Sequence, residues 1–198
     1  MTEFSTVLCA IETLLSQKDQ VILAIDGHCG AGKTTLALGL AHRFGGEVVH
    51  MDDFFLRPEQ RNVARLAEVG GNLDRERFQK ELLLPLLEGE PFFYRPFDCE
   101  TLVMGNPIPM NRSRFTVVEG CYSMHPEFGR YWDRALFLTI SPKEQRSRIG
   151  ARNPDMLSRF LQQWIPMENA YFEAFSIPDR CDFVMDGSQW DVSAISEY

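Results

Sequence analysis

Residues 21–36 combine an apolar run with a glycine-rich loop that could bind the phosphates of a nucleotide. The loop has the pattern Gly27-x4-Gly32-Lys33-Thr34. Glycines let backbone N–H groups turn toward a phosphate, and the N-terminus of the following helix adds its positive dipole. Lys33 can reach the β- and γ-phosphates, and Thr34 can offer a hydroxyl to Mg²⁺. The sequence therefore predicts nucleotide contacts from Gly27, Gly30, Ala31, Gly32, Lys33, Thr34 and Thr35.

Acidic residues close three of the expected strands: Asp52 with Asp53, then Glu119, then Asp186. Ligands of parallel sheets bind at the carboxyl ends of the strands, so these side chains should lie near the loop. Several carboxylates around one triphosphate need a cation to balance their charge. We expect this cation to be Mg²⁺, held by Thr34, Asp52 and Glu119 together with the phosphates of ATP.

Phosphoryl transfer to an alcohol needs a group that orients the hydroxyl and accepts its proton, and Asp52 can do both. Arg148 and Arg152 lie four residues apart on one expected helix, so both project to one side. Guanidinium groups over bound phosphates neutralise charge and exclude water, as a lid does. The predicted catalytic residues are Asp52, Lys33 and Arg148, with Arg152 as a further nucleotide contact.

Apolar runs alternate with amphipathic stretches along the chain. Strands are expected over 21–26, 47–51, 115–119, 134–140 and 181–185. Helices are expected over 2–18, 34–44, 74–87 (capped by Asp74), 142–152 and 153–175 (capped by Asn153), with a lid at about 143–160 and a hairpin-like insertion at about 91–114. This alternation predicts an α/β, three-layer P-loop NTPase fold with a five-stranded, mostly parallel sheet flanked by helices. We expect one domain over 1–198.

Other side chains near the motifs are expected to have structural roles. His28 and Cys29 lie inside the loop, where backbone amides carry the binding, and are expected to be bystanders. An aromatic stripe at helical spacing is expected to pack in the core: Phe160, Trp164, Tyr171, Phe172 and Phe175.

Composition narrows the class of protein further. The chain has 198 residues, of which 44% are apolar, and this supports a real core. Its formal charge of −8 argues against nucleic acid or an anionic membrane as partner. Five scattered cysteines predict neither a disulfide framework nor a zinc site. No apolar run is long enough to span a membrane, and no basic segment opens the chain, so we expect a cytoplasmic protein.

Three segments together carry a family resemblance: the loop with its flanks (Ile25 to Ala37), Met51-Asp52-Asp53-Phe54-Phe55, and Val117-Val118-Glu119-Gly120. In this order they resemble the uridine kinase/phosphoribulokinase family of P-loop kinases, and the Asp-Asp-Phe-Phe string also looks like nicotinamide riboside kinases. The resemblance extends over about residues 20–188.

This resemblance implies roles for individual residues. Asp52 would be the base and a Mg²⁺ partner, and Asp74 would grip ribose hydroxyls of the acceptor. Arg148 and Arg152 would lie in the lid over ATP, with Asp186 and Gly187 in the loop beside adenine. Further acceptor contacts would come from Asp53, Phe54, Arg95 and Asp98.

The sequence thus predicts an ATP- and Mg²⁺-dependent kinase of a small molecule, with the 5′-hydroxyl of a ribonucleoside such as uridine, cytidine or nicotinamide riboside as acceptor. An alternative is a regulatory P-loop protein that binds nucleotide without phosphoryl transfer. A signalling GTPase would need an Asn-Lys-x-Asp motif, and a transporter ATPase usually has a Leu-Ser-Gly-Gly motif; neither occurs. The acceptor, the choice between ATP and GTP and the oligomeric state are left open by the sequence.

Overall fold

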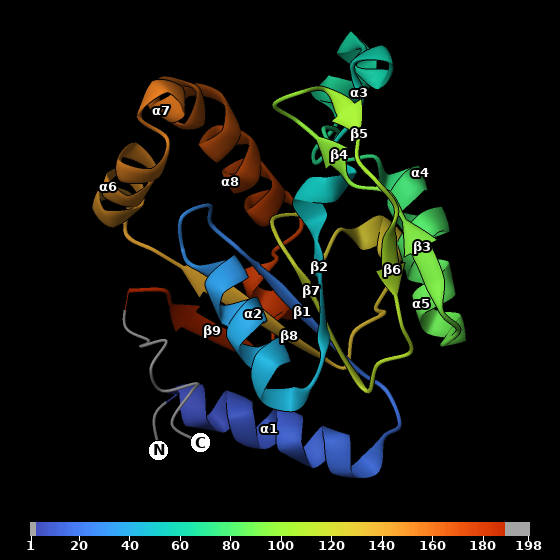
Figure 1. Ribbon diagram of the computed structural model, residues 1–198. Coiled ribbons are helices and arrows are strands. Elements are labelled where there is room, and N and C mark those ends of the chain that lie inside the picture. The colour runs from blue at the N-terminus through green and yellow to red at the C-terminus, as the bar shows by residue number, and fades with distance from the viewer. Residues whose placement is uncertain (1–2, 189–198) are drawn as a thin grey trace.

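The computed structural model describes residues 3–188, and its centre is a five-stranded parallel sheet. The strand order is β2-β7-β1-β8-β9, and every neighbouring pair is parallel. The strands are β1 (Val21–Gly27), β2 (Glu47–His50), β7 (Phe115–Glu119), β8 (Arg134–Thr139) and β9 (Phe183–Asp186). Helices lie on both sides of this sheet (Figure 1). The predicted α/β fold is confirmed, and the carboxyl ends of the five strands share one edge.

One face of the sheet is covered by α1 (Glu3–Gln17) and α2 (Lys33–Phe44). Leu23 and Ile25 of β1 point to this face and pack with Ile11 of α1 and Leu36 of α2. The alternation follows from the two-residue period of a strand. Burying this face fixes α2, and therefore the loop that precedes it, against the sheet.

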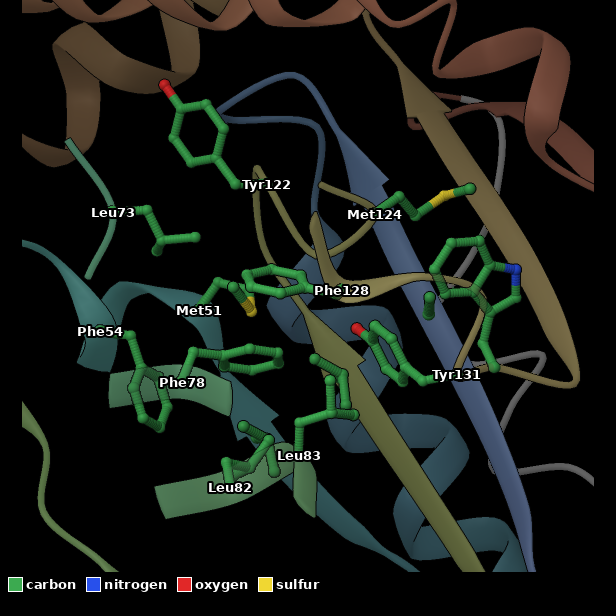
Figure 2. Packing of buried hydrophobic residues seen from close by; sticks show 14 of the residues in the cluster. Met51, Phe54, Leu73, Phe78, Leu82, Leu83, Tyr122, Met124, Phe128 and Tyr131 are labelled. Atoms are coloured by element: carbon green, nitrogen blue, oxygen red, sulfur yellow. The ribbon is translucent and has the colours of Figure 1, made fainter. Parts of the chain in front are cut away.

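The opposite face carries the second apolar cluster, seen closely in Figure 2. It is covered by α4 (Arg75–Phe78), a π-helical turn (Gln79–Leu83), α5 (Leu84–Glu88) and α8 (Ile165–Ala174). Phe78 is fully buried there, with its ring centroid 5.2 Å from that of Phe54 and 4.5 Å from that of Phe128. The helix expected over 74–87 is therefore present, and the Asp74 side chain caps it by accepting the Arg77 N–H.

Past the carboxyl edge of the sheet the chain forms a helical arm from α6 (Pro142–Arg152), a 3₁₀ turn (Pro154–Met156), α7 (Leu157–Arg159) and a π-helical turn (Phe160–Trp164) that leads into α8. The prediction of a single helix over 153–175 was wrong in detail. Asn153 precedes the 3₁₀ turn, but its side chain makes no capping hydrogen bond. This π-helical turn ends two residues before Pro166, and the π-helical turn Gln79–Leu83 ends two residues before Pro85. In both cases proline has no N–H to continue the regular hydrogen-bond ladder.

The insertion at 91–114 forms two antiparallel strand pairs, as the hairpin prediction implied. They are β3 (Phe92–Tyr94) with β6 (Ile108–Met110), and β4 (Phe97–Asp98) with β5 (Val103–Met104). A short 3₁₀ turn (Pro58–Gln60) and α3 (Val63–Ala67) precede it. The β4–β5 pair and α3 lie across from α7 in Figure 1. Within 3–188, no helix has the length and apolar character needed to cross a bilayer.

Truncation of Phe78 should reveal how much this second cluster stabilises the fold. We expect Phe78→Ala to lower the free energy of unfolding by about 3–5 kcal/mol, because it removes a fully buried ring and leaves a cavity. Phe93→Ala is the matched control, since that ring is 68% exposed, and it should change stability by less than about 0.5 kcal/mol. Urea unfolding measures both, and equal losses would contradict this account of the core.

Candidate functional site

The phosphate loop connects β1 to α2 and depends on its glycines. Gly27, Gly30 and Gly32 have φ angles of +133°, +76° and +95°, which disfavour residues with a Cβ. At Gly27 a Cβ would also lie 2.2 Å from the carbonyl oxygen of Leu138 on β8. The loop therefore lies directly on the neighbouring strand, and only glycine fits at its first position.

Lys33 is the buried cation of this loop. Its Nζ donates hydrogen bonds to the carbonyl oxygens of Gly27 (2.7 Å) and His28 (3.0 Å). Burial opposes the charge of the ammonium, but the nearby carboxylates of Glu168, Glu119 and Asp26 outweigh burial and raise the pKa of Lys33. Lys33 is thus held fully protonated beside the loop, as phosphate binding requires.

Thr34 and Glu119 meet as the sequence predicted. The Thr34 hydroxyl donates to Glu119 Oε1 at 2.9 Å, and His50 Nδ1 lies 2.6 Å from the same oxygen. The hydrogen bond with Glu119 raises the pKa of His50, although burial opposes this. A hydroxyl beside a carboxylate is the oxygen donor set that Mg²⁺ takes. Within 3–188 no cluster of three or more His, Cys, Asp or Glu side chains could hold a metal alone, so phosphate oxygens would have to complete the shell.

Asp52 lies in the 3₁₀ turn Met51–Phe54 that follows β2. The residue is open to solvent, yet protein surrounds its carboxyl group on the other sides. This reduced hydration, together with the negative charge of Glu119, raises the pKa of Asp52, while Lys33 opposes the rise. Residue 52 is therefore exposed to solvent, and the charges of Glu119 and Lys33 act on its carboxylate.

The arm and the loop after β9 both contact the phosphate loop. Arg148 of α6 donates to the carbonyl oxygens of Gly30 (3.3 Å) and Gly187 (3.2 Å). A Cβ at Gly187 would lie 2.1 Å from the Ala31 carbonyl oxygen. Asp186 accepts bonds from the backbone N–H and hydroxyl of Ser188. Arg148, Gly30, Ala31 and Gly187 thus form one group.

Arg152 differs from Arg148. It is exposed at the end of α6, and its side chain makes no hydrogen bond or ion pair with any other residue of 3–188. Its predicted contact with nucleotide remains a prediction.

A second group of polar side chains follows Asp52 in the chain. Asp53 accepts the Tyr94 hydroxyl hydrogen bond at 2.9 Å. Asp74 is buried, and its Oδ2 accepts a bond from Gln60 Nε2 at 2.8 Å. Arg77 donates to the carbonyl oxygens of Asp53 and Arg95. These contacts join the turn after β2, α4 and the insertion.

Three other residues predicted to contact the acceptor have structural partners. Phe54 is fully buried and its ring stacks 5.4 Å from that of Tyr94, so it lies in the core and not on the cleft surface. Arg95 donates to the Met104 and Gly105 carbonyl oxygens. Asp98 is exposed and accepts the N–H groups of residues 100 and 101 in the β4–β5 turn.

The sequence analysis missed three buried polar residues around the loop. Asp26 accepts bonds from the Gly27 and Met124 N–H groups and the Tyr171 hydroxyl, and burial raises its pKa to about 6 despite them. Glu168 and Gln145 both bond Cys29. Glu168 and Gln145 stand at helix positions with no motif around them. Asp26 could have been noticed, because a charged residue inside an apolar strand needs partners.

A hollow of about 350 Å³ lies behind the loop, next to His28, Phe172 and Asn169. Its lining includes the acids Glu173 and Asp179 and no lysine or arginine. This chemistry does not suit a phosphate. The positive charge of Lys33 and Arg148 lies instead at the loop itself, which remains the predicted phosphate site.

Comparison with solved structures bears on the fold. A possible uridine kinase from Bacillus stearothermophilus superposes with a TM-score of 0.67 at 20% identity, over 91% of this chain and 100% of the other. A protein from Silicibacter sp. TM1040, assigned provisionally as a fructose transport system kinase, gives 0.74 at 22% identity, over 93% and 99%. The chain shares the α/β fold of these two proteins. No protein-family model matches the chain, and no curated protein sequence matches it significantly.

The contact of Gly187 with Ala31 can be tested by adding one methyl group. We expect Gly187→Ala to weaken ADP binding by at least about tenfold, because the new Cβ must push the loop after β9 away from the phosphate loop. Gly150→Ala is the control, since a Cβ there meets only Leu157 Cδ2 at 3.5 Å, and it should leave affinity within about twofold. Calorimetric titration with ADP measures both, and an unchanged Gly187→Ala would count against this packing.

Proposed function

We propose that this chain is an ATP- and Mg²⁺-dependent kinase that transfers the γ-phosphoryl group to a hydroxyl of a small molecule. The observation that carries this proposal is the convergence of the buried Lys33 ammonium, the Thr34–Glu119 hydrogen bond and the accessible Asp52 carboxylate at one edge of the sheet. The kinase descriptions of the two similar structures support the same reaction class.

In the proposed reaction, the loop amides and Lys33 bind the β- and γ-phosphates, and Arg148 approaches them from the arm. Thr34, Glu119 and Asp52 would hold Mg²⁺ together with the phosphates, and the metal would supply charge neutralisation there. Asp52 orients the acceptor hydroxyl and takes its proton while the oxygen attacks the γ-phosphorus and ADP leaves.

The acceptor proposed here is the 5′-hydroxyl of a ribonucleoside or a ribose-like compound. Asp53 is the next residue after Asp52. Arg77 contacts both Asp53 and Asp74, and Gln60 donates a hydrogen bond to Asp74. A carboxylate such as Asp74 can accept bonds from two neighbouring hydroxyls of a ribose. Its Oδ1 accepts the Arg77 N–H and its Oδ2 accepts the Gln60 amide, so an acceptor hydroxyl would take the place of Gln60 at Oδ2.

Substitution of Asp52 tests the proposed base. Asp52→Asn should lower kcat by about 100- to 10,000-fold and leave the Kd of ADP within about threefold, because the amide keeps the shape but cannot accept the proton. Coupled ADP release, measured with a panel of ribonucleosides, nicotinamide riboside and sugars, gives the rates. Asp19→Asn, at an exposed site away from the loop, is the charge-matched control and should be unaffected.

The same assay separates the competing function. Full activity of Asp52→Asn would remove this residue as base. Binding of ATP with no acceptor-stimulated ADP release across the panel would instead favour a nucleotide-binding regulator.

A further inference from the structure

Cys29 lies in the middle of the phosphate loop, and side chains of two later helices form hydrogen bonds with its backbone. Its backbone N–H donates to Glu168 Oε2 at 3.0 Å, and its carbonyl oxygen accepts from Gln145 Nε2 at 3.0 Å. Glu168 belongs to α8 and Gln145 to α6, and both are buried, at 8% and 5% exposure. Two otherwise unexplained polar side chains are therefore directed at one residue of the loop.

The carboxylate of Glu168 also interacts with the cation of the loop. Glu168 is the strongest negative charge that acts on Lys33, and Lys33 is the strongest positive charge that acts on Glu168. Within 3–188 no direct ion pair joins the two. Burial raises the pKa of Glu168, and the loop N–H and Lys33 only partly offset this. The Cys29 N–H and Lys33 thus favour the charged form of Glu168, while burial opposes it.

A phosphate loop is built to attract anions through its N–H groups and its lysine. Here a side chain of the same protein uses one of those N–H groups and shares the field of that lysine. Any phosphate that binds the loop therefore meets a like charge beside Cys29. Such a contact lowers the affinity of the loop for anions, whatever the identity of the acceptor.

We propose that Glu168 sets the affinity of the loop for nucleotide phosphates by acting as an internal anion that competes for the Cys29 N–H and for Lys33. The inference rests on the proposed function only in that the loop binds phosphates. Because Glu168 lies on α8, its displacement by phosphate releases the contact of α8 with Cys29, while Gln145 and Arg148 still join α6 to the loop.

The test removes the charge of Glu168 but keeps the shape of its side chain. Glu168→Gln should bind ADP and inorganic tripolyphosphate, both without Mg²⁺, about tenfold more tightly than the unsubstituted protein, because the repulsion is gone. Tripolyphosphate probes the loop without the base or the acceptor site. A merely structural clamp would have the opposite effect, since its loss would loosen the loop and weaken binding.

The control is Glu173→Gln, which makes the same charge change on the same helix at an exposed position. It should leave both affinities within about twofold. Glu168→Ala, read in the same titrations, must tighten binding as well, which covers any failure of the glutamine variant to fold.

Unchanged or weaker binding by Glu168→Gln or by Glu168→Ala, when the unsubstituted protein binds ADP, would overturn the inference and leave the proposed kinase intact. If neither the unsubstituted protein nor the variants bind ADP or tripolyphosphate, the nucleotide-binding loop itself is refuted, and the inference falls with it.

Discussion

The site is organised around a single buried ammonium among several carboxylates. Lys33 is fixed by two loop carbonyl oxygens and lies in the field of Glu168, Glu119 and Asp26. These acids keep Lys33 charged, but together they leave the cleft rich in negative charge. A triphosphate can enter such a site only with additional positive charge. In the proposed function, Mg²⁺ at Thr34 and Glu119 and the guanidinium of Arg148 would supply this charge together.

The shape of the site comes from the sheet. Gly27 lies against Leu138 of β8, and Gly187, after β9, lies against Ala31 of the loop. These backbone contacts leave no space for side chains, so the strand order β1-β8-β9 directly determines where the loop can lie. Apolar clusters on both faces hold those strands in register. The stability of the fold and the geometry of the loop therefore depend on the same packing.

The parts of the site that the sequence could predict are those carried by local spacing. The phosphate loop, Glu119 at the end of its strand and Asp52 after the next could be recognised because strand ends of a parallel sheet converge. Glu168 could not, because its partner Cys29 is 139 positions away in the chain and a helical position carries no motif. The assignment of Phe54 to the acceptor came from a family pattern, and the structure shows that its ring serves the core.

The most direct test of this account is the affinity for MgATP after the ammonium of Lys33 is removed. Calorimetric titration of Lys33→Met should show binding weakened by at least about a hundredfold, with the fold kept, because the acids around the loop would then repel the phosphates without the opposing charge of Lys33. Lys143→Met, at an exposed position of α6, should bind as the unsubstituted protein does. Equal affinity of Lys33→Met and the unsubstituted protein would contradict the central claim.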